Sequence, residues 1–169
     1  MQKIKRSVFG HVCQLGYVTN DFDRSLAVFA ENGVPQFVER RYLKIQTGAG
    51  EAADLHIGLA VVDGMQIELI QPLGGDDTIY RSALGDESYE LHLHHICQLI
   101  SDSEEFDRLK EGVEAGGIKV ALWGVSPTGS KYFYADTRVA LGHYIEYIYR
   151  DPAMDEAFLA GIPAFAVTP

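Results

Sequence analysis

The chain has 169 residues, which fits one compact domain or two tightly joined halves. Hydrophobic residues make up 47% and charged residues 22% of the chain, and these globular values exclude a disordered polymer. The formal net charge is −10 and the longest basic cluster is the short stretch from Lys3 to Arg6, which excludes an electrostatic nucleic-acid surface.

The first half of the chain combines an amphipathic helix with apolar, β-branched strands. Asp21 is a typical helix cap and Gly33 a typical helix stop. Between them, Phe22, Leu26 and Phe29 recur at helical spacing, so this helix is expected to cover a sheet. The predicted elements are a strand at 11–19, the helix at 21–33, and strands at 37–46, 55–62 and 65–71, the last two joined by a hairpin turn at 63–64.

The second half repeats this β-α-β-β-β order. Its helix is predicted at 103–115, with Phe106, Leu109 and Val113 facing inward and a Gly-Gly stop at 116–117. The other predicted elements are strands at 92–100, 119–125, 131–137 and 143–149, a short helix at 78–84 in the connection between the halves, and a C-terminal helix at 151–160.

Two pairs of residues at matched offsets support a duplication. Gln14 lies seven residues before the helix cap Asp21, and His95 lies seven residues before the corresponding Asp102. We therefore predict a first module at 1–73, a connecting segment at 74–90, a second module at 91–150, and a C-terminal helix and tail at 151–169.

The last strand of each half carries the second pair. Ile-Glu-Leu-Ile at 67–70 and Ile-Glu-Tyr-Ile at 145–148 place Glu68 and Glu146 at 54 and 51 residues after Gln14 and His95. A pseudo-twofold arrangement of the halves would bring all four side chains into one concave sheet.

Strand alternation places three of these four residues on apolar faces. Gln14 shares its face with Val12 and Val18, and His95 and Glu146 have equally apolar neighbours. Buried without partners, a neutral polar group costs roughly 1–3 kcal/mol and a carboxylate costs more, so these residues need partners. Alternation alone would turn Glu68 toward solvent with Gln66, but its place as the repeat partner of Glu146 predicts an inward position.

The four residues suit a divalent metal ion. A Gln amide oxygen, an imidazole nitrogen and two carboxylates form a mixed site whose two negative charges neutralise the cation. The ligand set favours Zn, Ni, Co, Mn or Mg. By the same alternation, His94 points to the face opposite His95, which predicts a core or interface histidine.

These residues resemble the vicinal oxygen chelate superfamily of glyoxalases, bleomycin resistance proteins, epimerases and extradiol dioxygenases. The similarity runs from about residue 11 to 150 and rests on His-His-Ile at 94–96 and the two Ile-Glu-x-Ile motifs. It implies an α+β fold in which two paired βαβββ modules form a concave mixed sheet. It also implies that the metal ligands are Gln14, Glu68, His95 and Glu146, a set most like that of the glyoxalase I family and similar to the methylmalonyl-CoA epimerase family.

The resemblance implies a metal-dependent lyase or isomerase of the glyoxalase type. A small substrate with adjacent oxygens would chelate the metal, and a proton next to its carbonyl would move through a metal-stabilised enediolate. Glu146 would be the mobile catalytic base, and Glu68 would stay bound or assist from the opposite face.

The chain departs from glyoxalase I where that family binds glutathione. Val18, Leu91 and Pro72 stand where two arginines and an asparagine would be expected. An acyl-CoA epimerase or an enzyme acting on small 2-oxo or 2-hydroxy acids therefore stays open. Two other classes also stay open: a non-catalytic binding protein resembling bleomycin resistance proteins, and a structural or regulatory protein with vestigial ligands.

Location and assembly follow from weaker signals. No apolar run approaches the ~18 residues of a membrane span, and no secretory signal is recognised at the N-terminus. Cys13 and Cys97 form no Cys-x-x-Cys pair, so a cytoplasmic protein with reduced thiols is expected. Open sheet edges would favour a homodimer, and no nucleic-acid or membrane partner is expected.

Overall fold

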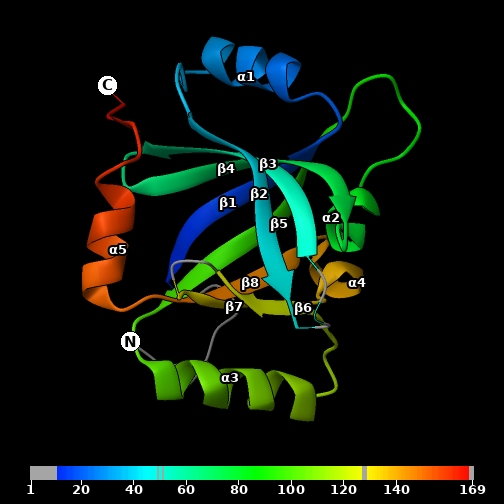
Figure 1. The fold of residues 1–169 in the computed structure, drawn as a ribbon, viewed down its shortest axis with the longest axis vertical. Coiled ribbons are helices and arrows are strands. Elements are labelled where there is room, and N and C mark those ends of the chain that lie inside the picture. Colours follow the sequence, from blue (N-terminus) through cyan, green and yellow to red (C-terminus); the bar gives the residue numbers. More distant parts are fainter. Residues whose placement is uncertain (1–10, 49, 51, 127–128, 168–169) are drawn as a thin grey trace.

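A curved sheet of nine strands dominates the computed structural model, which describes residues 11–48, 50, 52–126 and 129–167 (Figure 1). The strand order is β2-β6-β7-β8-β5-β1-β4-β3-β9, and β2 also pairs with β3. The strands are β1 (Val12–Thr19), β2 (Val38–Thr47), β3 (Ala52–Val62), β4 (Met65–Gly75), β5 (Leu91–Ile100), β6 (Val120–Val125), β7 (Lys131–Ala135), β8 (Tyr144–Tyr149) and β9 (Ala164–Phe165).

Two longer helices lie on opposite sides of the molecule, outside the sheet (Figure 1). Asp21 caps α1 by accepting from the Arg24 N–H at 3.0 Å, and Asp102 caps α3 by accepting from the Glu105 N–H at 2.6 Å. Both caps were predicted, and both helices are confirmed. The helices are α1 (Phe22–Glu31), α2 (Thr78–Arg81), α3 (Ser103–Ala115), α4 (Arg138–Leu141) and α5 (Pro152–Leu159).

The sheet is built from two equivalent halves. In each half the first strand runs parallel to the last, β1 beside β4 and β5 beside β8, and the halves meet where β1 and β5 run antiparallel. The register is symmetric, since Gly16 lies opposite Glu68 in one half and Cys97 lies opposite Glu146 in the other. The predicted fold of two paired βαβββ modules in a concave mixed sheet is confirmed.

Three apolar clusters stabilise this arrangement. One packs α1 against the sheet around Phe22 and Leu69, and a second packs α3 against it around Phe106 and Phe133. The third and largest fills the concave side of the sheet, where it includes Leu55 and several tyrosines. The concave side is therefore largely filled, so only a small cavity is left there.

The outer ends of the two halves are joined. Strands β2 and β6 pair at Gln46–Val125 and Thr47–Gly124, and the Tyr132 hydroxyl donates to the Gln46 carbonyl at 3.0 Å. The edges of the predicted open sheet are thus partly paired with each other. The argument for a homodimer from open edges is weakened accordingly, and the homodimer stays a prediction.

Some element boundaries differ from the predictions. Strand β4 continues through Pro72 to Gly75, where Leu73 is an extra residue opposite Asp54 and Leu55 of β3 and shifts the register. Helix α2 ends at Arg81 instead of residue 84, and α4 and β9 were not predicted because four- and two-residue elements carry too little periodicity. The ranges of the two modules stay a prediction, and residues 1–10 of the first one lie outside the described residues.

None of the helices described here is long and apolar enough to cross a membrane.

The pairing of β2 with β6 generates a stability prediction at Gly124. A Cβ at this position would lie 2.2 Å from the Gln46 carbonyl oxygen and 2.4 Å from the Tyr132 hydroxyl. Gly124→Ala is expected to force the two strands apart and to lower the free energy of unfolding by about 1–3 kcal/mol. Urea denaturation measures this change.

Gly161→Ala is the matched control, because the nearest atom to its Cβ would be 4.0 Å away. Equal stability of the two variants would show that the contact between β2 and β6 contributes little.

Candidate functional site

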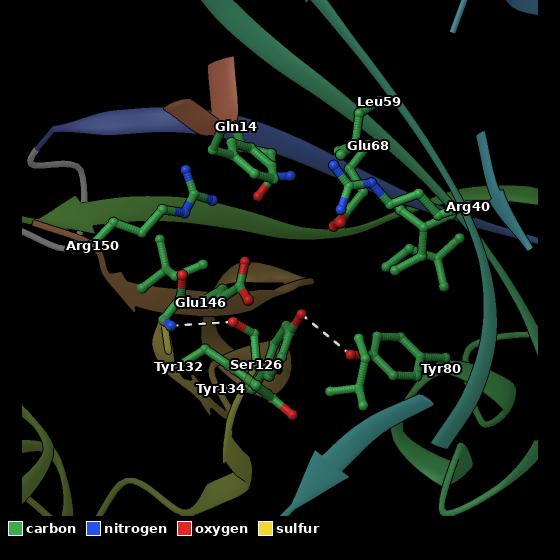
Figure 2. A pocket seen from close by; sticks show the side chains of 16 residues that line it. Gln14, Arg40, Leu59, Glu68, Tyr80, Ser126, Tyr132, Tyr134, Glu146 and Arg150 are labelled. Carbon is green, nitrogen blue, oxygen red and sulfur yellow. Dashed lines mark hydrogen bonds between the residues drawn. The ribbon is translucent and has the colours of Figure 1, made fainter. Parts of the chain in front are cut away.

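A cavity of about 170 Å³ lies on the concave side of the sheet (Figure 2). Isoleucines and Leu59 form much of its wall, and its polar lining comes from strands of both halves and from the segment after β8. The polar and aromatic residues that the structure places there are Gln14, Arg40, Glu68, Tyr80, Ser126, Ser130, Tyr132, Tyr134, Glu146, Arg150 and Phe158.

The structure brings the four predicted residues together. Gln14 is 3% exposed, Glu146 6%, and the Glu68 side chain 14%, and all three line the cavity. His95 is fully buried behind them, within ion-pair distance of both carboxylates. Gln14 and His95 come from the central strands β1 and β5, and Glu68 and Glu146 from the strands that flank them.

Two irregularities in the register of β1 and β5 determine the direction of the Gln14 and His95 side chains. Gly16 lies opposite His95 but Tyr17 lies opposite Leu93, so His94 is an extra residue in β5. Symmetrically, Cys13 is an extra residue between the pairs Val12–Gln98 and Gln14–Cys97. An extra residue breaks the alternation of a strand and redirects the next side chain.

Because the alternation is broken at these two residues, two predictions based on strand alternation are wrong. Val12 packs in the cluster under α3, whereas Gln14 lines the cavity, so the two do not share a face. His94 does not point away from His95, because the two rings are hydrogen-bonded to each other. The prediction that His94 is a core histidine is correct, since only 2% of it is exposed.

Gly16 provides the space for the His95 ring. A Cβ at this position would lie 1.9 Å from Cε1 and 2.2 Å from Nε2 of His95. A side chain there would displace the imidazole, so the close packing of β1 on β5 requires glycine.

A chain of hydrogen bonds determines which nitrogen of His95 carries a proton. The Ile79 carbonyl can only accept, so His94 donates to it from Nε2 at 3.1 Å. Burial lowers the pKa of His94 to about 3, so this ring is neutral and its Nδ1 is an acceptor. The contact of 3.0 Å between the two Nδ1 atoms then requires His95 to donate. In the neutral His95 ring, Nε2 therefore presents a lone pair.

That nitrogen faces two carboxylates and has no hydrogen-bond partner. Nε2 of His95 lies 3.3 Å from Oε2 of Glu68 and 3.4 Å from Oε2 of Glu146. These separations exceed the ~2.7–2.9 Å of a charge-assisted hydrogen bond. They match the edges of a coordination polyhedron, which are about 3.0–3.4 Å for ligands about 2.1 Å from a metal.

The nitrogen and oxygen atoms of these side chains therefore fit a divalent cation. In this structure the side chains contact one another and leave no space between them for the ion. Among the described residues, no three His, Cys, Asp or Glu side chains are already spaced to hold an ion. Small rotations of the two carboxylates would be needed to admit one.

The electrostatics of the site are dominated by the same three groups. Burial disfavours a charged His95, but the Glu146 and Glu68 carboxylates outweigh it and raise the pKa of His95 to about 9. Burial also disfavours a charged Glu146, yet its contact with His95 lowers the pKa of this carboxyl overall. Burial raises the pKa of the Tyr80 and Tyr134 hydroxyls, which stay neutral as hydrogen-bond donors.

The sequence analysis missed several residues of the cavity. Arg150 was detectable, because it lies four residues after Glu146 and alternation puts both on one face of β8 and its extension. Tyr132 and Tyr134 alternate in the same way on β7, whereas no local signal marks Arg40. Phe158 lines the cavity from α5, which lies beside the sheet and is far from β2 in the sequence (Figure 1).

The chain matches the family described as the glyoxalase/bleomycin resistance protein/dioxygenase superfamily over residues 13–135. It therefore belongs to this superfamily, as the sequence analysis predicted. No curated protein matches the chain significantly.

Solved structures with similar folds include methylmalonyl-CoA epimerases. A variant of the Streptomyces coelicolor enzyme in complex with 2-nitronate-propionyl-CoA has a TM-score of 0.58 at 14% identity, covering 85% of this chain and 96% of that one. The Mycobacterium tuberculosis enzyme has a TM-score of 0.58 at 14% identity, covering 91% and 97%. A hypothetical protein from Bacillus halodurans C-125 has a TM-score of 0.55 at 16% identity, covering 83% and 94%. At these identities the likeness shows the fold alone.

The raised pKa of His95 predicts a pH-dependent stability of the metal-free protein. A protonated His95 stabilises the fold fully below the ordinary pKa of 6.5, and this contribution is lost as the pH rises through about 9. The free energy of unfolding should fall over this window by on the order of 3 kcal/mol relative to a His95→Gln variant. Chemical denaturation of both chelator-treated proteins across the window tests this. Parallel curves would contradict it.

The hydrogen-bond chain predicts that His94 fixes the His95 tautomer. His94→Phe keeps a ring among Tyr80, Tyr134 and Tyr144 but removes the acceptor for His95 Nδ1. We expect the ¹⁵N shifts of His95 at a pH above 9 to show one tautomer in the unaltered protein and a mixture in the variant. A single, unchanged tautomer in the variant would exclude this role.

Proposed function

We propose that the chain is a metal-dependent isomerase, epimerase or lyase that moves a proton next to the carbonyl group of a small substrate. Gln14, Glu68, His95 and Glu146 hold the divalent ion, which is Zn, Ni, Co, Mn or Mg. The substrate is a small molecule with adjacent oxygens. We further propose that the protein acts in the cytoplasm as a homodimer.

One observation carries this proposal: Nε2 of the fully buried His95 lies 3.3 Å and 3.4 Å from two carboxylates without a hydrogen-bond partner. The imidazole nitrogen and the two carboxylates all carry electron pairs that repel one another. In a buried site they need a cation among them, either a proton or a metal ion. The amide oxygen of Gln14 lines the same cavity and supplies a fourth donor.

A bound divalent ion would polarise the substrate carbonyl and make the neighbouring proton more acidic. The protein side chains would then transfer the proton. Glu146 accepts the proton, because it lines the cavity and the neutral Tyr134 hydroxyl lies beside it. The largely apolar wall limits the water beside the reacting groups.

The pseudo-twofold symmetry supports an epimerase or isomerase. Glu68 and Glu146 occupy equivalent positions in the two halves and approach His95 from strands on either side of the central pair. A substrate held between them would present opposite faces to two carboxylates. One carboxylate can then remove a proton from one face while the other returns a proton to the opposite face.

Metal content tests the ligand assignment. Protein purified without added metal, or loaded with Co or Zn, should hold about one divalent ion per chain by elemental analysis. Removing the amide, imidazole or carboxylate ligand in Gln14→Ala, His95→Gln or Glu68→Ala should reduce affinity by tenfold or more. Glu114→Gln on the surface of α3 is the control. Unchanged metal content in all ligand variants would refute the site.

Proton exchange in deuterated water tests the reaction. Coenzyme A thioesters and 2-oxo or 2-hydroxy acids are incubated with the metal-loaded protein, and deuterium incorporation next to the carbonyl is measured by mass spectrometry. Glu146→Gln should lower the exchange rate by at least about 100-fold while metal stays bound, because the amide cannot accept the proton. Metal and ligand binding without exchange would favour the binding-protein class.

A further inference from the structure

The cavity contains two arginines that the proposed proton transfer does not use. Arg150 is only 5% exposed, although it lines the cavity. Arg40 on β2 lines the cavity as well and is exposed to solvent, so it lies where the cavity meets the surface. The buried guanidinium group of Arg150 in a mostly apolar cavity requires a reason, because desolvating a cation is unfavourable.

Arg150 is held rigidly by the segment that follows β8. Its Nη1 donates to Asp155 Oδ1 at 2.7 Å, and its guanidinium group stacks 4.0 Å from the centre of the Phe158 ring. Both partners belong to α5, which packs beside the sheet between β8 and β9 (Figure 1). A guanidinium group fixed in this way is prepared to bind a planar anion without further loss of side-chain freedom.

Arg40 approaches the same aromatic ring from the other half of the molecule. Its guanidinium carbon lies 5.9 Å from the centre of the Phe158 ring. Since Arg150 lies at 4.0 Å from that point, the two guanidinium carbons are within about 10 Å of each other. Figure 2 shows both side chains on the side of the cavity where Gln14 and Glu68 lie.

The charges in the cavity are unbalanced by one positive charge when a divalent ion is bound. Glu68 and Glu146 balance the ion, and Asp155 balances Arg150. Within the described part of the chain, no carboxylate lies within ion-pair distance of Arg40. The guanidinium group of Arg40 is therefore free to pair with an anionic group of a ligand.

We propose that Arg40 and Arg150 form a subsite for an anionic oxygen group of the substrate, a carboxylate or a phosphate. This inference rests on the proposed function, because it assigns the substrate class of the same site. The cavity of about 170 Å³ is smaller than the ~300–1,000 Å³ of common ligand pockets, so it takes a short substrate or only the reacting end of a larger one.

Arg150 directly follows β8, and its partners Asp155 and Phe158 belong to α5. The C-terminal segment thus supplies a recognition element for a site whose four polar residues come from the two modules.

Calorimetry with lactate and lactamide tests the proposal, because these molecules share a shape and adjacent oxygens but differ by one negative charge. The metal-loaded protein should bind lactate at least about tenfold more tightly than lactamide. Arg40→Gln and Arg150→Gln should each weaken lactate binding by about 10-fold and leave lactamide binding unchanged. Arg108→Gln on the exposed side of α3 is the matched control.

A second variant guards against misfolding of Arg150→Gln. Asp155→Asn keeps the guanidinium group but removes its counter-charge, so it should strengthen lactate binding several-fold. Competition with inorganic phosphate identifies the source of the anion: displacement of lactate that depends on both arginines assigns the subsite to phosphates, and a lack of displacement assigns it to carboxylates.

The same titrations on chelator-treated protein separate the two proposals. Discrimination between lactate and lactamide that persists without metal and depends on the arginines supports the subsite even if no metal-dependent exchange is found. Lactate binding that is unaffected by Arg40→Gln and Arg150→Gln in the metal-loaded protein would overturn the subsite while leaving the proposed function intact.

Discussion

A fully buried imidazole between two carboxylates is the constraint on which the site depends. His95 has no exposed surface, one nitrogen donates to His94, and the other faces Glu68 and Glu146. This arrangement requires glycine at position 16 and a carbonyl from α2 behind His94. The connection between the two halves is therefore part of the site, although none of its residues belongs to the predicted ligand set.

The symmetry of the two halves brings the four polar side chains together, and a difference between the halves at one pair of equivalent positions determines which strand supplies the imidazole. Cys13 and His94 are equivalent extra residues in β1 and β5, and each precedes a side chain that reaches the centre. The equivalent positions after them differ, with glycine at 16 and cysteine at 97. Only glycine leaves room for a ring on the opposite strand, so the imidazole of His95 comes from β5. The smaller amide of Gln14 comes from β1, where it lies opposite Cys97.

Two contacts bound the cavity on the concave side of the sheet. The pairing of β2 with β6 joins the outer ends of the halves, and α5 with β9 connects β8 back to β3. The burial of His95 and Glu146 beside the cavity strengthens the interaction between their charges, because the local dielectric constant falls. The cavity also limits the size of the substrate. The C-terminal segment thereby links the closing of the cavity to the two arginines that face it.

The sequence by itself determined the duplicated α+β fold, the capped helices α1 and α3, and the inward convergence of Gln14, Glu68, His95 and Glu146. These follow from local periodicity and from offsets that a duplication preserves. Only the tertiary structure decided the role of His94, the closing of the sheet and the arrival of Arg40 and Phe158 at the cavity. Strand alternation cannot reveal an extra residue in a register, because the register is set by the partner strand. Contacts between β2 and β6, or between α5 and β2, join residues far apart in the chain, so no local pattern encodes them.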